Sequence, residues 1–489
     1  MLIFLSLLIP ILAVGLIISI GEKNNYLRNS VIMIACLIDF GIVLWIAQLV
    51  WSGNFPVFTL VETPTFSFQF RVDHFGVFMG ILVTFLWILT ELYSFGYMTG
   101  EHKQTRYFAC LTFCLTATLG IVFAANLLTL FIFYELLTYA VYPLVIHEES
   151  EEALRSGTAY LVYLLTGGIM LLFATLWTYK LTGGDISFTP GGIPLLRGQS
   201  KYALYGLFLL LILGFGFKSA LMPLHSWLPR AMIAPTPISA LLHAVAVVKV
   251  GLYGIIRAIY CIFGPDLFKE LYLNYLLAGL ASITIILGAI TALRQSKIKR
   301  MLAYSTINQL SFVILGAASC HPIGLLGALL HFIYHSVMKI TLFYTAGSII
   351  KQTGKTLIKE MVGLAGKMPL TSAAFAIAAW GIVGLPPVAG WVSKWYLLRG
   401  FFALGQYIFI FVIIIGSVIE IGFLLPPIVY AYFKTDTQIP ADVVATPMIH
   451  RGKQSPLKEP SLSMLVPILI VALLSLIFGV IGGLPLKLA

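Results

Sequence analysis

The chain has 489 residues, of which 60% are hydrophobic and only 10% are charged, whereas a soluble domain carries about 25% charged residues. Its formal net charge is +11, but no basic and aromatic patch large enough for RNA or DNA is present. The composition therefore excludes a soluble enzyme or a nucleic-acid-binding protein and indicates an integral membrane protein.

Apolar runs close to the ~20 residues that cross a bilayer recur along the whole chain. Ten-residue segments of alternating hydrophobicity, typical of membrane barrels, are not seen, so helices must satisfy the backbone in lipid. The predicted fold class is therefore all-α, and the first run, which lacks a basic leader and a cleavage site, is predicted to be a retained helix. The 14 predicted spans are residues 2–20, 29–51, 74–97, 106–124, 126–146, 157–180, 202–222, 236–262, 272–294, 300–319, 322–350, 370–398, 403–433 and 462–482.

Lysine and arginine are distributed unevenly between the two sides of these spans. Of the 30 basic residues, the loops after odd-numbered spans hold 18 and the opposite side holds seven. Because basic residues stay cytoplasmic, we expect a multi-pass protein of the cytoplasmic membrane with both termini on the outer side.

The remaining five basic residues lie inside predicted spans. Each ionised side chain at mid-membrane costs about 2.5–3.5 kcal/mol, so such residues usually face a bundle interior or a wet cavity and mark ion or proton paths. Arg257 lies toward the end of its span, where a structural role is equally open. The five are Lys218, Lys249, Arg257, Lys339 and Lys394.

Carboxylates also occur within the spans. Glu135 and Glu420 lie near the middle of the fifth and thirteenth spans, too far from either end to reach water, so each needs a partner or a proton. Asp39 stands apart from the lysine-bearing spans, which favours a structural hydrogen bond. Glu91 is nearer a span end, which favours an interfacial position.

Histidines add groups that titrate near neutral pH. His331, His335 and Lys339 are spaced by four residues and so share one helix face. His243 precedes Lys249 on the eighth span, and His225 follows the break in the seventh. A single buried histidine is usually a structural hydrogen-bonding group, but the aligned trio favours a role in proton transfer.

Two lysine-bearing spans contain helix breakers. Lys218 precedes Pro223 in the seventh span, and Gly384, Pro386 and Pro387 precede Lys394 in the twelfth. Proline removes a helical hydrogen bond and kinks the chain, and transporters place ion sites at such breaks. A packing kink without a role in transport is the alternative reading of either break alone.

The two broken helices, 7 and 12, are five spans apart. A unit of five helices crosses the membrane an odd number of times, so a second copy must enter it upside down. This predicts two inverted five-helix repeats, spans 4–8 and 9–13. The predicted organisation is an N-terminal three-helix segment (1–105), a first repeat (106–262), a second repeat (263–433), and a loop with a C-terminal helix (434–489).

Several segments together resemble a known family. The chain is similar to the antiporter-like subunits of respiratory complex I, Mrp-type multisubunit cation/proton antiporters and energy-converting membrane hydrogenases, and its end most resembles the Mrp D-type protein and its hydrogenase-complex relatives. The matching segments are FYELLTYAVYPLV, FGFKSALMPLHSWLPRAMIAPTPISALLHAVAVVKVGLYG, SKIKRMLAYSTINQLSFVILG, HFIYHSVMKITLFYTAGS and GLPPVAGWVSKWYL.

The resemblance implies roles for individual residues. Glu135 and Lys218 match an ion pair of the fifth and seventh helices, whose separation tunes the lysine's affinity for a proton. Lys249 matches a connecting lysine on the eighth helix. His331 and His335 match a relay on the eleventh helix, and Lys394 the terminal site on the twelfth. Such a row would pass protons laterally, and Lys339 lies on the same helix face as the relay.

The chain departs from the family pattern in places. Tyr134 stands where a tryptophan is common, and Glu420 stands where relatives commonly have a neutral residue, so a carboxylate near Lys394 could alter proton exit or offer a cation site. An extra lateral helix, as in the largest complex I subunit, is not expected.

The function predicted from all this is that of a proton-translocating, antiporter-like subunit. The resemblance implies other membrane subunits as partners, H⁺ and Na⁺ as the ions, and no cofactor or metal in this chain, so any catalytic chemistry belongs to the partners. A stand-alone cation/proton transporter fits the broken helices equally well. A haem-binding subunit would explain the histidines, but His331 and His335 lie on one helix, whereas haem ligands usually come from facing helices.

Overall fold

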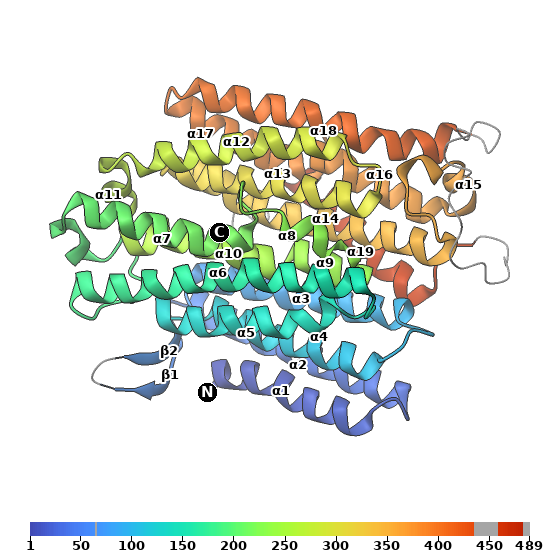
Figure 1. The fold of residues 1–489 in the computed structure, drawn as a ribbon, viewed down its shortest axis with the longest axis horizontal. Coiled ribbons are helices and arrows are strands. Elements are labelled where there is room, and N and C mark those ends of the chain that lie inside the picture. The colour runs from blue at the N-terminus through green and yellow to red at the C-terminus, as the bar shows by residue number, and fades with distance from the viewer. Residues whose placement is uncertain (64–65, 435–457, 483–489) are drawn as a thin grey trace.

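The computed structural model describes residues 1–63, 66–434 and 458–482. Long helices run side by side and form one bundle (Figure 1). The long helices are α1 (Leu2–Ile20), α2 (Asn25–Trp51), α3 (His74–Tyr97), α4 (Gln104–Val122), α5 (Leu127–Val145), α6 (Glu151–Thr182), α7 (Lys201–Ser219), α12 (Leu273–Leu293), α13 (Ile298–Ala318), α14 (Pro322–Thr353), α18 (Tyr407–Phe433) and α19 (Leu462–Ile481).

The remaining helices are shorter and lie mainly at breaks and loops. They are η1 (Pro194–Gly198), α8 (Trp227–Arg230), η2 (Ala231–Ile233), α9 (Thr236–Ala244), α10 (Val247–Arg257), η3 (Ala258–Phe263), α11 (Pro265–Glu270), η4 (Ile358–Glu360), α15 (Leu364–Lys367), α16 (Pro369–Val383) and α17 (Ala389–Ala403).

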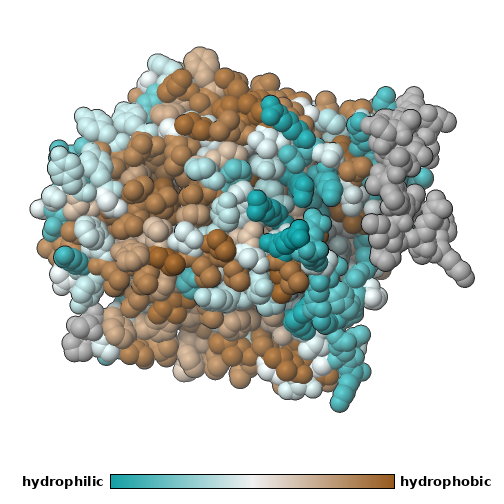
Figure 2. All heavy atoms as spheres, in the orientation of Figure 1, coloured by the Kyte–Doolittle hydropathy of each residue, from teal (hydrophilic) through white to brown (hydrophobic). Residues whose placement is uncertain are grey.

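The predicted helical membrane fold is confirmed. Within the described residues, 13 helices are long and apolar enough to cross a membrane, counting Thr236–Phe263 as one. The shorter pair α16 and α17 occupies the twelfth predicted span, so 14 spans and their repeat relation stay predictions. Apolar side chains dominate the middle of the face in Figure 2, and hydrophilic ones gather toward the end near α15, as expected for a bundle that lies in a bilayer.

Helix starts follow local chemistry. The side chains of Asn24, Asp73, Asn126 and Ser150 each accept a hydrogen bond from a backbone N–H in the first turn of the helix that follows. These caps satisfy donors that have no partner inside the helix. They fix the starts of α2, α3, α5 and α6, which lie within six residues of the starts of the predicted spans.

A small β-hairpin between α2 and α3 was not predicted. Strands β1 (Val57–Glu62) and β2 (Ser67–Arg71) pair antiparallel at one end of the bundle (Figure 1). The Phe70 ring lies 5.6 Å from the ring of Phe133 on α5, between centroids, so the hairpin is packed onto the helices. Its two strands are too short to stand out from a loop in the sequence.

Three spans are interrupted. The predicted breaks occur after α7, where the chain is irregular up to α8, and between α16 and α17. A third break, at Val245 and Ala246, separates α9 from α10. It was not predicted, because the sequence there contains neither glycine nor proline.

The centre of the bundle is formed by α9 and α10, α13 and α14. In the most apolar stretch of Thr236–Phe263, and in that of α13, 94% of the residues are buried, more than in any other candidate span of the described chain. Helix α14 packs against α9, α13, α16, α17 and α19. Side chains on α14 therefore lie between α9 on one side and the broken helix formed by α16 and α17 on the other.

Arg257, whose role the sequence left open, forms a structural ion pair. Its Nη1 and Nη2 lie 2.5 and 2.7 Å from the two carboxylate oxygens of Asp73, the N-cap of α3, and its Nε donates to the Tyr253 hydroxyl at 2.9 Å. Burial raises the pKa of Asp73, but the charge of Arg257 and the hydrogen bonds from Arg257 and Gly76 more than offset this and hold it below its ordinary value. The pair joins α10 to α3.

A cluster of charged and aromatic side chains lies where α4 begins and α5 ends. Glu149 lies 2.5 Å from both Lys103 and Arg106, and hydrogen bonds from these two residues lower the pKa of Glu149 to about 2. Beside them the buried His147 ring stacks on His102 at 4.7 Å between centroids. Burial, followed by the charges of His102 and Arg106, lowers the pKa of His147 to about 4.

This buried histidine should make the protein less stable in acid. Between pH 6.5 and about 4 the unfolded chain binds a proton that folded His147 does not, so stability falls as pH falls through that window. We expect His147→Phe, which keeps the ring and removes the titration, to reduce the loss of thermal stability between pH 7 and pH 5. The same variant of His74, outside this cluster, serves as the control. An unchanged pH dependence in His147→Phe would contradict the assignment.

Candidate functional site

The predicted site residues lie on a succession of helices that starts at α5 and continues through α7, α9, α10, α14 and α17 to α18. The residues that are fully or almost fully buried are Lys218, His243, Lys249, His331, His335, Lys339, Lys394 and Glu420. Glu135 is only partly buried, and His225 is half-buried in the irregular segment before α8. Each residue is described below with its contacts.

Glu135 and Lys218 are close but are not paired directly. The Lys218 ammonium donates a hydrogen bond to the backbone carbonyl of Tyr134 and lies 3.3 Å from the centroid of the Tyr134 ring. The described residues contain no ion pair between Lys218 and Glu135, although the charge of each acts on the other. One oxygen of Glu135 is buried against α6, where a Cβ on Gly168 would lie 2.0 Å from it.

Lys249 connects α10 to α14. It lies in the first turn of α10, directly after the break that follows α9. Its ammonium donates to the carbonyl of Phe332 at 2.8 Å and lies 4.1 Å from the centroid of the Phe332 ring. The third break therefore positions Lys249 against α14, which gives that break a place in the candidate site.

Two buried histidines of the candidate site have no hydrogen-bond partner for either ring nitrogen within the described chain. These are His243, which stacks on Phe343 at 4.6 Å between centroids, and His335. His335 lies within electrostatic range of Lys249, Lys339, His331 and His243, and its ring is 6.3 Å from that of His331. Buried polar groups normally have a partner, so these ring nitrogens are suited to internal water.

Lys394 fills the break between α16 and α17. Its ammonium has four oxygen neighbours: the carbonyls of Ile382 and Val383 at 2.9 and 3.0 Å, the Ser417 hydroxyl at 2.8 Å and a carboxylate oxygen of Glu420 at 2.7 Å. The two carbonyls end α16, where the helix leaves them without an internal partner. Glu420, whose role was open from the sequence, is thus the ion-pair partner of Lys394.

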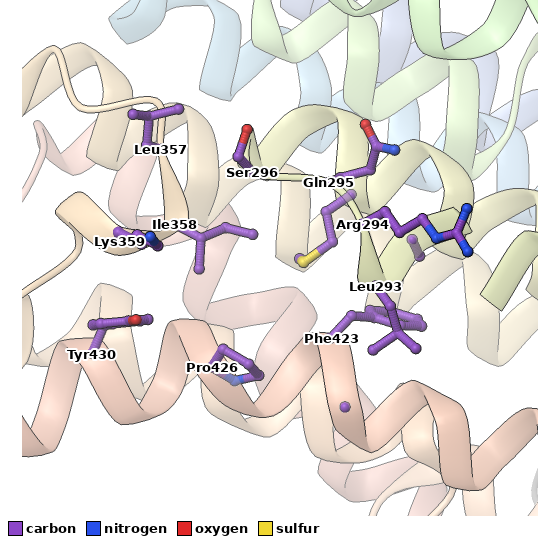
Figure 3. Close-up of a pocket in the computed structure, with 13 residues that line it drawn as sticks. Leu293, Arg294, Gln295, Ser296, Leu357, Ile358, Lys359, Phe423, Pro426 and Tyr430 are labelled. Carbon is purple, nitrogen blue, oxygen red and sulfur yellow. The ribbon is translucent and has the colours of Figure 1, made fainter. Parts of the chain in front are cut away.

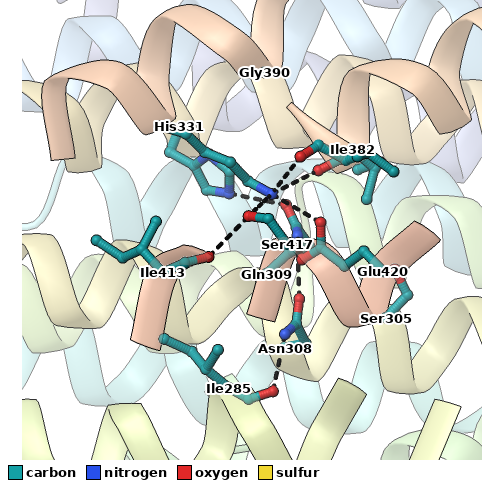
Figure 4. Close-up of polar contacts among 12 residues, drawn as sticks. Ile285, Ser305, Asn308, Gln309, His331, Ile382, Gly390, Ile413, Ser417 and Glu420 are labelled. Atoms are coloured by element: carbon teal, nitrogen blue, oxygen red, sulfur yellow. Dashed lines mark hydrogen bonds and ion pairs between the residues drawn. The ribbon is translucent and has the colours of Figure 1, made fainter. Parts of the chain in front are cut away.

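Gln309 links this site to the histidines (Figure 4). Its amide nitrogen donates to the other oxygen of Glu420, and its amide oxygen lies 3.0 Å from Nε2 of His331. Because an amide oxygen only accepts, Nε2 must carry a hydrogen. Nδ1 of His331 lies 2.9 Å from the Ser393 hydroxyl, which also has the Gly390 carbonyl at 3.0 Å. Ser393 can donate to a neutral ring or turn to Gly390 when Nδ1 is protonated.

Sequence reasoning missed the neutral side chains of the site. Ser305 accepts a hydrogen bond from Lys339 at 2.8 Å, and Gln309, Ser393 and Ser417 make the contacts given above. Ser305 and Gln309 are four residues apart on α13, so they share one face. That polar pair within an apolar span was the signal that could have identified them.

Two carboxylates of the N-terminal helices differ from expectation. Glu91 is fully buried on α3, so its predicted interfacial position is wrong, because α3 is enclosed by α2, α4, α9, α14 and α19. Asp39 on α2 is also fully buried, and neither of its oxygens has a hydrogen-bond partner within the described residues. The predicted structural hydrogen bond of Asp39 is therefore not found.

A pocket of about 390 Å³ opens where α12 ends and α13 begins, beside η4 and α18 (Figure 3). Arg294 and Lys359 line it, and its wall on α18 starts at Gly422, two residues after Glu420. It contains none of the predicted site residues. The positive charge of its lining makes it a poor receptor for a cation.

Comparison with known proteins relates this geometry to a family. The family profile described as NADH:quinone oxidoreductase/Mrp antiporter, TM, matches residues 124–420. A second profile, NADH-Ubiquinone oxidoreductase (complex I), chain 5 N-terminus, matches residues 58–108. The first match covers more than half of the chain and includes every predicted site residue.

Individual proteins give the same result. NADH-quinone oxidoreductase subunit N of Desulforudis audaxviator (strain MP104C) is 31% identical over 429 residues, which cover 85% of this chain and 82% of that protein. A Na(+)/H(+) antiporter protein of Bacillus subtilis (strain 168), the D component of its complex, is 26% identical over 479 residues, which cover 98% and 93%.

Two solved structures share the fold. One is the membrane-bound sulfane sulfur reductase, an archaeal respiratory membrane complex (TM-score 0.87, 23% identity, covering 99% of this chain and 96% of that chain). The other is the Mrp complex from Dietzia sp. DQ12-45-1b (TM-score 0.86, 21% identity, covering 100% and 96%). The chain therefore belongs to the family of multi-pass membrane subunits shared by NADH:quinone oxidoreductase and Mrp antiporters.

Proposed function

We propose that this chain is a proton-translocating subunit of a multisubunit membrane complex. The observation that supports the proposal is the succession of buried titratable side chains from Glu135 to Glu420, which no fold requires and which each cost free energy to bury. Its two ends are carboxylates, Lys249 and the histidines lie between them, and internal water would join the groups that do not touch.

The switch at the first broken helix is the position of Lys218. A lysine that approaches Glu135 holds its proton more tightly, and one that moves away into apolar surroundings gives it up. The contact with the Tyr134 carbonyl represents the separated arrangement. His331 then passes protons between Lys249 and Lys394, because its surroundings can satisfy both the neutral and the protonated ring.

The larger organisation belongs to the same proposal. Residues 106–262 contain the broken helix of Lys218 and residues 263–433 that of Lys394, as two inverted repeats would, and the first of these segments has a further break between α9 and α10. The basic ends of the helices face the cytoplasm, with both termini on the outer side of the cytoplasmic membrane.

Displacement of Glu135 gives a test that leaves its charge in place. In Gly168→Ala the new methyl group would lie 2.0 Å from the Glu135 carboxylate and must push that flexible side chain away. We expect proton translocation in inside-out vesicles, followed with a pH-sensitive dye, to fall severalfold while the complex still assembles. Gly206→Ala on α7 has no heavy atom within 4 Å of its new methyl group, and full activity is expected. Equal activity in both variants would argue against a role for the Glu135 position.

The parent assembly can be determined directly. Relatives include both an oxidoreductase subunit and an antiporter subunit, so the driving force is either electron transfer or an ion gradient. We expect mass spectrometry of the chain purified in mild detergent to identify stable partner subunits. Iron–sulfur subunits would indicate a redox-driven pump, and small membrane subunits alone would indicate an antiporter. Purification without any partner would contradict the proposal and favour a stand-alone transporter.

A further inference from the structure

The oxygen cage around Lys394 has more acceptors than an ammonium group can use. An ammonium has three N–H donors, but four oxygens lie within 3.0 Å of Lys394 Nζ. They come from the end of α16 and from two side chains on α18. Such an arrangement surrounds a positive charge rather than matching individual hydrogen bonds.

The donor set has the chemistry of an alkali-cation site. It contains one carboxylate, one hydroxyl and two backbone carbonyls at a helix C-terminus, which carries a partial negative charge. Hard cations select oxygen ligands of this kind, and transporters use the carbonyls of interrupted helices for the same purpose. Gln309 fixes the second oxygen of Glu420, so the carboxylate is held in place without the lysine.

We propose that this cage binds a monovalent alkali cation, Na⁺ or K⁺, in place of the Lys394 ammonium. When Lys394 gives its proton to the histidine row, the neutral amine no longer balances Glu420, and a buried unpaired carboxylate is strongly unfavourable. A cation that enters as the amine withdraws restores the balance. One proton and one cation thus exchange at a single position, a step that rests on the proposed function.

The other groups near Lys394 fit this exchange. The titratable side chains near Lys394 are Glu420 on α18 and His331 on α14. Lys339, also on α14, acts on Glu420. Helix α13 contributes neutral polar groups and the ring of Phe312, whose centroid is 4.9 Å from Nζ. Helices α16 and α19 have no charged residue. Glu420 is therefore the one carboxylate near Nζ within the described residues.

The test measures binding of ²²Na⁺ and ⁸⁶Rb⁺ to the purified complex in parallel at several pH values. In the wild type one bound cation displaces one proton, so we expect the half-saturating concentration to rise about tenfold for each unit that the pH falls below the titration of Lys394. Lys394→Met should bind the cation without competition from a lysine proton, so that its half-saturating concentration is lower than that of the wild type wherever Glu420 is ionised. Lys394→Arg, which stays charged, should not bind it at any pH, and Glu420→Gln should lose binding.

Lys180→Met, at an exposed lysine in the last turn of α6, is the matched control and should bind the cation like the wild type. Integrity of each complex is checked by size-exclusion chromatography, and sites in other subunits are subtracted with the Lys394→Met, Glu420→Gln double variant. Binding in Lys394→Arg equal to wild type, or no binding in Lys394→Met, would overturn the cation site. Proton translocation could still depend on Lys218 in that case, so failure of this inference is distinguishable from failure of the proposed function.

Discussion

Lys218→Met should reduce proton translocation to the level of vesicles that lack the protein. Methionine keeps much of the lysine's length and removes its charge, so the buried contact with the Tyr134 carbonyl and the response to Glu135 are both lost. Lys218 has no direct ion-pair partner within the described residues, so its replacement breaks no buried ion pair, and we therefore expect normal assembly. Proton uptake into inside-out vesicles is the measurement, with the amount of complex determined by immunoblot.

Glu135→Gln should have the same effect, because it removes the charge to which Lys218 responds. Lys180→Met serves as the control, since Lys180 is an exposed lysine in the last turn of α6 and its loss should leave transport unchanged. Full proton uptake in both Lys218→Met and Glu135→Gln would exclude the proposed pathway.

Asp73→Ala should destabilise the protein by about 3–5 kcal/mol, because it leaves the guanidinium of Arg257 buried without its counter-ion. Arg257 is 3% exposed and is held by both oxygens of Asp73. The expected result is a marked fall in the unfolding temperature of the complex, measured by intrinsic fluorescence, without a specific loss of proton uptake at low temperature.

The surface pair of Arg197 and Asp266, at 3.6 Å, gives the matched control. Both side chains are more than half exposed, and exposed pairs contribute only about 0–1 kcal/mol to stability. Asp266→Ala should therefore leave the unfolding temperature nearly unchanged. The double variant Asp73→Ala, Arg257→Met should recover part of the lost stability because no unpaired charge remains. Equal effects of Asp73→Ala and Asp266→Ala would show that the buried pair is not a structural link.

The sequence predicted the helices well because lipid imposes length and composition on each of them. Thirteen of the 14 predicted spans correspond to long apolar helices, and proline and glycine marked two of the three breaks. The break at Val245 and Ala246 has no such marker, since it is stabilised by tertiary packing in the most buried part of the bundle.

Within the candidate site, the sequence identified the charged residues but could not predict which of them contact one another. Lys394 and Glu420 could each be identified as costly residues, whereas their contact depends on how α17 and α18 pack. Gln309 carries no charge, so only its position between His331 and Glu420 reveals its importance. The surroundings of Glu91 were predicted wrongly because the position of a residue in a span indicates only its depth in the membrane. It does not indicate which neighbouring helices cover the side chain.

Glu135 is only partly buried, and its exposure bears on where the proposed proton pathway begins. Along α5 it lies between Ile132 and Tyr139, whose side chains are 41% and 57% exposed, so one side of this carboxylate faces outward from the bundle rather than toward its core. Lipid cannot solvate a carboxylate, and an adjacent protein surface is the natural covering for that face. We therefore expect proton translocation to require the assembled complex, in which a neighbouring subunit covers Glu135 and contributes to its surroundings.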